Sequence, residues 1–239
     1  MSGPLVARWL AVEGVPGQAG TLAHASVEVE NAGSAPWRTR GPEEGHFLSY
    51  HWLDGRGNPI VWDGIRTPLE DAVAPGTTLR QRMAIRAPIP PGSYRLAVDI
   101  VEEHRFWLAE LGVEPFERGA EVGRRDASGA RHYLGEDTEP APDWAERART
   151  LHEEGYAAVG GAIEARRAPA GLEEYAPEAG SGRRPGFRHP LVCPSLLPPL
   201  EPNDEVAGLP AYRPDEDEPW MFDGRLRITL RSRSGRRRA

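Results

Sequence analysis

The chain contains no lysine, a single cysteine and no long apolar run. All 29 basic residues are arginine, a bias that we attribute to a GC-rich coding sequence, so a single arginine carries little weight as a functional signal. The lone Cys193 excludes an internal disulfide and suits a reducing compartment. No stretch resembles a signal peptide or approaches the roughly 20 apolar residues of a membrane span. We therefore expect a cytoplasmic protein that does not span a membrane.

Motifs that carry catalysis are also missing. The sequence has no G-x-S-x-G elbow, no Walker A loop, no G-x-G-x-x-G and no H-E-x-x-H. His46 and His51 lie five residues apart on one expected strand, so they face opposite sides and cannot share a metal ion. His189 and Cys193 could reach a common ion, but no second pair of ligands lies nearby. The sequence favours a non-catalytic protein without a metal or cofactor.

Charge is distributed unevenly along the chain. The formal net charge is −7, from 29 arginines and 36 acidic residues. Seven of the arginines and none of the acids lie in residues 225–239, which leaves 22 arginines against 36 acids in the rest of the chain. Such an acidic body repels nucleic acid, which we exclude as a partner. The tail, RSRSGRRRA, is either a polybasic arm that contacts an anionic surface or a solvated end.

The chain is rich in turn residues and in segments where apolar and polar residues alternate. Its 24 prolines and 27 glycines favour many turns and little helix. In the stretch from His46 to Pro68, Leu48, Tyr50 and Trp52 alternate with polar residues, as in a strand with one buried face. Asp-Gly and Gly-Asn-Pro then supply turn geometry before the apolar pattern resumes. This stretch is predicted to be a β-hairpin.

Other segments alternate in the same way. Gln81 is expected to be the one polar residue on the inner side of its strand. Tyr94 follows a Pro-Gly turn and enters a strand, the position of a tyrosine corner in Ig-like sandwiches. Seven or eight short strands at regular spacing predict an Ig- or fibronectin-like antiparallel β-sandwich over residues 1–113. The remaining strands are expected over residues 5–12, 22–31, 79–86, 94–100 and 105–111.

The second half of the chain is predicted to be an α+β extension. Residues 114–142 are polar and irregular and are interpreted as a linker. A helix is expected over 143–154, and strands over 156–165 and 224–231, with long proline-rich loops between them. Because these elements make only a thin core, we expect the extension, 143–239, to pack on the sandwich.

Four segments of the first half carry a family resemblance. They are VENAGSAPW, LSYHWLDGRGNPIVWDGIRTPL, VAPGTTL and RAPIPPGSYRLAVDIVEEHRFW. In this order they resemble an Ig-like domain that is appended to bacterial methyltransferases, glycosyltransferases and related proteins of cell-surface polysaccharide synthesis. The resemblance covers roughly residues 27–111. It implies a β-sandwich with an accessory, non-catalytic role, in glycan contact or in subunit docking, and it supplies no functional residues.

The outward positions of three neighbouring strands form a candidate ligand site. A sugar ring presents an apolar face and a rim of hydroxyls, so an exposed tryptophan beside carboxylate, imidazole and guanidinium groups suits glycan binding. In the alternative interpretation, the C-terminal half covers this face and its tryptophan is inter-domain core. The residues of this candidate site are His51, Arg95, Asp99 and Trp107.

A second exposed candidate lies near the hairpin tip. Trp62 and Asp63 could contact a glycan, whereas an Asp63–Arg66 pair that braces the loop is the structural alternative.

A third candidate binds phosphate. The segment GSGRRPGFRH, residues 180–189, is rich in glycine and basic residues, and Arg183, Arg184, Arg188 and His189 could hold a nucleotide-sugar. That hypothesis would make the protein a divergent transferase or an enzyme subunit, and its alternative is an arginine-rich loop without a ligand. The leading hypothesis is an accessory module that binds a glycan or a protein partner beside polysaccharide machinery.

Overall fold

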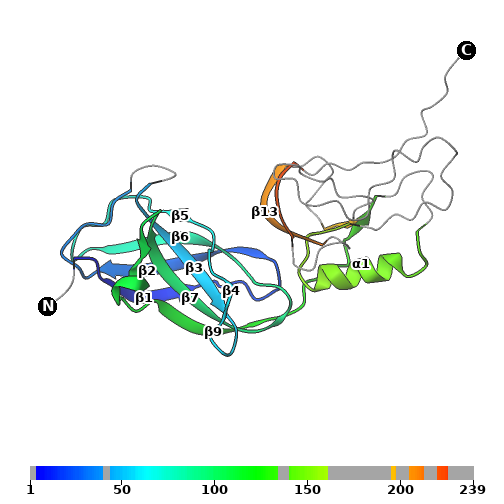
Figure 1. The fold of residues 1–239 in the computed structure, drawn as a ribbon, viewed down its shortest axis with the longest axis horizontal. Coiled ribbons are helices and arrows are strands. Elements are labelled where there is room, and N and C mark those ends of the chain that lie inside the picture. The colour runs from blue at the N-terminus through cyan, green and yellow to red at the C-terminus, as the bar shows by residue number, and fades with distance from the viewer. Residues whose placement is uncertain are drawn as a thin grey trace, which may run out of the picture. The chain divides into compact units, whose positions relative to one another are not determined.

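The computed structural model describes residues 4–39, 44–133, 140–160, 195–197, 205–212 and 220–225, the last two stretches by their backbone. The chain divides into two compact units, Met1–Arg125 and Asp126–Ala239 (Figure 1). The described residues are mainly β, in largely antiparallel sheets, with one α-helix. The expectation of a mainly β protein is confirmed.

The first unit contains a three-stranded antiparallel sheet in the order β1-β2-β6. Its middle strand matches the predicted span, and Ala25, Val27 and Val29 are buried on one face as the alternation predicts. On the last strand, the amide of Gln81 donates to the Pro68 carbonyl oxygen at 3.0 Å. The strands are β1 (Ala7–Glu13), β2 (Leu22–Asn31) and β6 (Thr78–Arg86).

A six-stranded sheet forms the other layer of this unit (Figure 1). Its path is β4-β3-β7-β8, while β5 pairs with β3 and β9 pairs with β7. Trp52 lies opposite Val61 in an antiparallel pair, so the predicted hairpin is confirmed. The strands are β3 (His46–Leu53), β4 (Pro59–Val61), β5 (Thr67–Pro68), β7 (Gly92–Glu102), β8 (Phe106–Trp107) and β9 (Phe116–Val122).

The two sheets share one apolar core. Trp52 is completely buried, and its indole N–H donates to the Arg86 carbonyl oxygen of the other sheet at 2.8 Å. The Tyr94 hydroxyl donates to the Pro90 carbonyl oxygen at 2.6 Å, the hydrogen bond predicted for a tyrosine corner. Burial of this common layer is the main stabilising term of the unit. Its buried members include Val27, Val29, Leu48, Tyr50, Trp52, Met83, Ile85, Leu96, Val98 and Ile100.

Two predicted boundaries in this unit are wrong. The strand expected over 105–111 is only β8, followed by the 3₁₀ helix η1 (Leu108–Leu111). The expected linker over 114–142 contains β9, which pairs with β7 along its length. Phe116 and Ala120 of β9 pack on the core, but the polar residues between them mask the alternation.

In its described residues, the second unit has one helix and a five-stranded sheet in the order β10-β12-β11-β13-β14. The helix α1 (Trp144–Glu153) follows Asp143 as predicted. The strand expected over 156–165 is observed as β11, and its remainder from residue 161 lies outside the described residues. Of the strand expected over 224–231, residues 224 and 225 end β14 and the rest lies outside the described residues. The strands are β10 (Arg131–His132), β11 (Ala158–Val159), β12 (Ser195–Leu196), β13 (Glu205–Tyr212) and β14 (Trp220–Arg225).

Candidate functional site

The candidate glycan residues lie on the face of the six-stranded sheet that points away from the common core. Strands β3 and β7 pair so that Ser49 lies opposite Asp99 and His51 opposite Ala97. Strand β8 adds Trp107 opposite Val101 on the next strand. The expected adjacency of these three strands is therefore confirmed. We call this surface the outer face.

A short segment after β4 folds back onto the outer face. The Gly64 N–H donates to the Tyr50 carbonyl oxygen at 3.0 Å, and the Ser49 hydroxyl donates to the Gly64 carbonyl oxygen at 3.1 Å. A Cβ on Gly64 would lie 2.4 Å from the Tyr50 carbonyl oxygen, so only glycine allows this approach. The contact fixes the segment that carries Trp62 against β3.

Three aromatic side chains meet there, and we call them the aromatic cluster: His51, Trp62 and Trp107. The His51 and Trp62 rings stack with centroids 4.2 Å apart and planes 25° apart. Trp107 lies against His51 at 4.2 Å and against Trp62 at 6.3 Å. The His51 Nδ1–H donates to the Trp62 carbonyl oxygen. This hydrogen bond alone would raise the pKa of His51, but burial outweighs it and lowers the pKa, so the neutral ring is favoured.

Arg66 connects the aromatic cluster to carboxylates. Its guanidinium carbon lies 4.6 Å from the Trp107 ring centroid, a cation–π geometry. The same group donates to Glu103 at 2.8 Å and to Asp63 at 2.9 Å. Burial alone would lower the pKa of Arg66, but these two partners outweigh it and raise the pKa. The predicted pairing of Asp63 with Arg66 is confirmed.

The expected exposure of the outer face is wrong for its central residues. Asp99 is completely buried, His51 is 5% exposed and Trp107 is 7% exposed. The segment around Gly64 and the 3₁₀ helix after β8 cover them, and Trp107 also packs with Phe47 and Val101. Trp62, by contrast, is 50% exposed. The two candidate groups thus form one site whose accessible ring is Trp62.

Asp99 has a structural role in this face. One carboxylate oxygen accepts the Ile100 N–H at 2.7 Å, and the other accepts the Ala109 N–H at 3.1 Å. The second bond holds the first turn of η1 on the sheet. Burial raises the pKa of Asp99 to about 6 against the pull of these two N–H donors.

Arg95 does not join the aromatic cluster. It is exposed, lies opposite Leu53 at the far end of β3, and its Nε is 3.5 Å from a Glu117 carboxylate oxygen. Glu103, which the sequence did not indicate, takes part instead. It lies 37 residues beyond Arg66 in a turn, so no local pattern could have paired the two.

The predicted phosphate site lies outside the described residues. The site consists of Arg183, Arg184, Arg188 and His189. Cys193 and the tail from residue 226 also lie outside the described residues. In the described part of the chain, no group of three His, Cys, Asp or Glu side chains is placed to hold a metal ion. No helix among the same residues combines the length and apolar character needed to cross a membrane.

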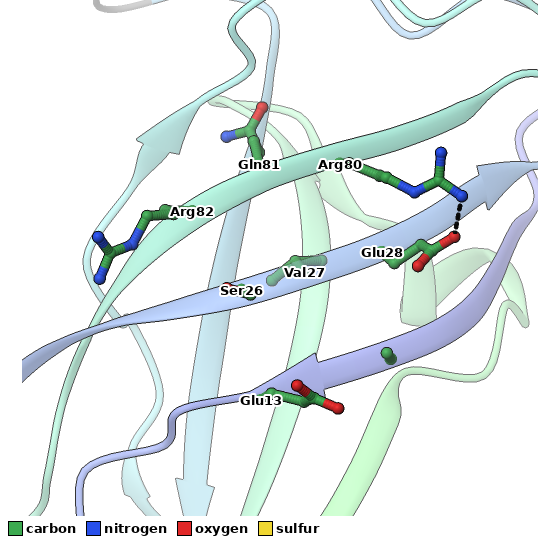
Figure 2. Close-up of a pocket in the computed structure, with 8 residues that line it drawn as sticks. Glu13, Ser26, Val27, Glu28, Arg80, Gln81 and Arg82 are labelled. Atoms are coloured by element: carbon green, nitrogen blue, oxygen red, sulfur yellow. Dashed lines mark hydrogen bonds and ion pairs between the residues drawn. The ribbon is translucent and has the colours of Figure 1, made fainter.

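A groove of about 370 Å³ lies on the three-stranded sheet. Figure 2 shows Glu28 and Arg80 on neighbouring strands, joined by an ion pair of 2.6 Å. No aromatic residue lines this groove, so it lacks the ring that stacks on a sugar. Its lining residues are Ala11, Glu13, Ser26, Val27, Glu28, Arg80, Gln81 and Arg82.

Comparisons with known proteins place the chain in no family. No family model matches it, and no curated protein matches it. Among solved structures, a Bordetella pertussis protein that carries the name ApaA is similar over 50% of this chain and 92% of its own. The two are 21% identical with a TM-score of 0.24, and this likeness carries no argument about fold or function.

Proposed function

We propose that this protein is a non-catalytic accessory module, in which an Ig-like β-sandwich binds a carbohydrate on the exposed ring of Trp62. Two antiparallel sheets with a common core support the Ig-like architecture. The hydrogen bond from the Tyr94 hydroxyl to the Pro90 carbonyl supports it further, because it has the character of a tyrosine corner. The resemblance to Ig-like domains of surface-polysaccharide proteins suggests a bacterial polysaccharide as the ligand.

One observation carries the proposal: Trp62 is half exposed although His51 stacks on one face of its ring. The accessible area therefore belongs to the opposite face and the ring edge. The exposed part of the indole offers an apolar stacking surface, and the C–H face of a pyranose is a suitable partner for it. Because the ring is already fixed by His51 and Trp107, binding costs little side-chain entropy.

Polar groups beside Trp62 can satisfy sugar hydroxyls. The Asp63 side chain is 67% exposed, and Arg66 and Glu103 are 26% and 21% exposed. Carboxylate oxygens accept hydrogen bonds from hydroxyls, and a guanidinium donates to them. An exposed ring with a rim of fixed donors and acceptors is the arrangement of a shallow glycan site.

A protein ligand is the second candidate for the same surface. Ile60 and Ile65 flank Trp62 in the sequence and are 46% and 36% exposed. An apolar group of this kind also suits docking to another protein. A sugar needs only the ring, whereas protein docking would use the isoleucines as well.

Glycan-array screening of the whole chain, followed by calorimetric titration of the best glycan, tests the carbohydrate proposal. We expect Trp62→Ala to weaken binding by about fivefold to thirtyfold, because one stacked ring contributes on the order of 1–2 kcal/mol. Leu10→Ala is the matched control: Leu10 is 48% exposed on the other sheet and its loss should leave binding unchanged. If wild-type protein binds no glycan on the array, the carbohydrate proposal fails and protein docking remains.

A further inference from the structure

Arg66 is the cation beside the aromatic cluster, and its N–H groups are almost all occupied. A guanidinium carries five N–H donors. The Nε atom of Arg66 donates to Glu103 at 2.8 Å, and Nη2 donates to Asp63 at 2.9 Å. Nη1 donates to the Ser49 hydroxyl oxygen and to the Gly64 carbonyl oxygen, both at 3.1 Å. One N–H group is left, so Arg66 has little capacity to bind an anionic group of a ligand.

The carboxylates that pair with Arg66 keep free acceptor atoms. Arg66 engages only Oδ1 of Asp63 and Oε2 of Glu103. Among the described residues, no hydrogen bond or ion pair engages the other oxygen of either carboxylate. Because a carboxylate has about four lone-pair sites, the site offers a ligand more acceptors than donors. The Asp63 side chain, at 67% exposure, is the more accessible of the two.

The charge balance of the site is negative. Besides the two carboxylates on Arg66, a third one lies at the aromatic cluster, where Glu110 accepts the Trp107 N–H at 3.1 Å. Arg105, the next arginine along the chain, is paired with a carboxylate of its own, Glu102. Three negative charges and one positive charge leave a formal charge of −2 around the cluster. Such a site attracts cations and repels anions.

The indole of Trp62 strengthens this preference. Its ring is half exposed, and the His51 ring that stacks on one face is favoured in its neutral form. The open face of an indole carries negative charge from its π electrons and therefore attracts a cation. Asp63 is the next residue along the chain, so its exposed carboxylate can pair with the same cation. Ring and carboxylate act in the same direction.

We propose that the carbohydrate bound on Trp62 is positively charged: an amino sugar whose amine is free and protonated. This inference rests on the proposed carbohydrate function and names the ligand class of the same site. The ammonium group donates hydrogen bonds to the unengaged carboxylate oxygens of Asp63 and Glu103, while the C–H face of the pyranose stacks on the indole. An N-acetylated sugar lacks the charge, and a uronic acid is repelled.

Calorimetric titration of three trimers into the full chain tests the charge of the ligand. They are a glucosamine trimer at a pH where its amines are protonated, its N-acetylated counterpart and a galacturonic acid trimer. We expect the glucosamine trimer to bind about threefold to thirtyfold more tightly than the N-acetylated one, and the galacturonic acid trimer to bind most weakly. Raising sodium chloride from about 50 mM to about 500 mM should remove most of this preference.

Asp63→Asn tests the residue that carries the preference. The amide is isosteric and loses only the charge, so we expect about twofold to fivefold weaker binding of the glucosamine trimer and unchanged binding of the N-acetylated trimer. Glu13→Gln is the matched control: it removes an equal charge at an exposed position on the three-stranded sheet (Figure 2) and should leave both affinities unchanged.

The outcomes separate this inference from the carbohydrate function on which it rests. If the N-acetylated or the galacturonic acid trimer binds at least as tightly as the glucosamine trimer, the ligand class is wrong and the carbohydrate function stands. The same conclusion follows if Asp63→Asn keeps the full preference of the wild type, or if only neutral or acidic glycans bind on the array. If no glycan binds at all, both proposals fail.

Discussion

The two faces of strand β3 are both buried, yet they are built from different chemistry. On the inner face, Leu48, Tyr50 and Trp52 pack into the common apolar core. On the outer face, Ser49 and His51 are equally inaccessible, at 0% and 5% exposure, but they are held by hydrogen bonds and ring contacts. Alternation along a strand therefore reports the polarity of each face and not whether water reaches it.

The difference between the faces decides where a ligand can bind. The inner face lies between the two sheets of the first unit and belongs to their common apolar core. In the described part of the first unit, the segment around Gly64 and η1 lie on the outer face, and the segment around Gly64 carries Trp62 with half of its side chain exposed. The buried polar groups of the outer face thus hold in place the segment that carries the accessible Trp62 ring.

Loss of Trp52 should be the largest effect on the inner face. Trp52→Ala removes a completely buried indole and its hydrogen bond to Arg86. We expect the free energy of unfolding to fall by about 3–5 kcal/mol, measured by urea titration. A loss below about 1 kcal/mol would contradict the placement of Trp52 in the core. Trp62→Ala, at a half-exposed position, is the control and should cost less than Trp52→Ala.

Asp99 should give the outer face a pH dependence between about pH 4 and pH 6. The pKa of Asp99 is about 6 in the folded protein, against 3.8 for an unperturbed aspartate. Between pH 3.8 and pH 6 the native state therefore keeps a proton that the unfolded state has lost. This group therefore makes stability fall as the pH rises from about 4 to about 6, by at most about 3 kcal/mol. His51, whose pKa is lowered by burial, acts with the opposite sign below pH 6.5.

The contribution of Asp99 is isolated with Asp99→Asn. The free energy of unfolding of both proteins is measured by urea titration at several pH values. The value for the wild type should fall relative to that for Asp99→Asn as the pH rises from 4 to 6. A difference that stays constant across this range would mean that the Asp99 pKa is not raised.

Arg66 tests how much the polar network of the outer face contributes. Arg66→Gln leaves Glu103, at 21% exposure, without its ion pair, and we expect a loss of about 1–2 kcal/mol in the free energy of unfolding. Arg95→Gln is the matched control on the same sheet, because Arg95 is exposed and 3.5 Å from its carboxylate, and it should cost less than about 0.5 kcal/mol. Equal losses in the two variants would mean that the network adds no stability.

The sequence predicted those strands in which apolar and polar residues alternate clearly within the strand itself. Strand β2 was predicted to the residue because its inward side chains up to Val29 are apolar and most outward ones are polar. Strand β9 was missed because charged residues separate Phe116 from Ala120. The covering of the outer face was also missed, since it depends on the close approach of Gly64 to Tyr50 across the fold.

The candidate site was predictable to the same extent. Asp63 and Arg66 lie three residues apart, and a local pattern sufficed to pair them. The joining of Trp62 to His51 and Trp107 required the tertiary fold, since these three residues come from β3, the segment after β4, and β8. A tryptophan's exposure is set by which segments cover it, so the sequence favoured Trp107 where the accessible ring is Trp62.

The solvent accessibility of individual tryptophans tests this account most directly. The seven tryptophans can be replaced by 5-fluorotryptophan, and the ¹⁹F signals of Trp52, Trp62 and Trp107 assigned with single Phe variants. A soluble paramagnetic relaxation agent should attenuate the Trp62 signal strongly and leave those of Trp52 and Trp107 nearly unchanged. A protected Trp62 signal, or a Trp107 signal attenuated as much as that of Trp62, would contradict the site.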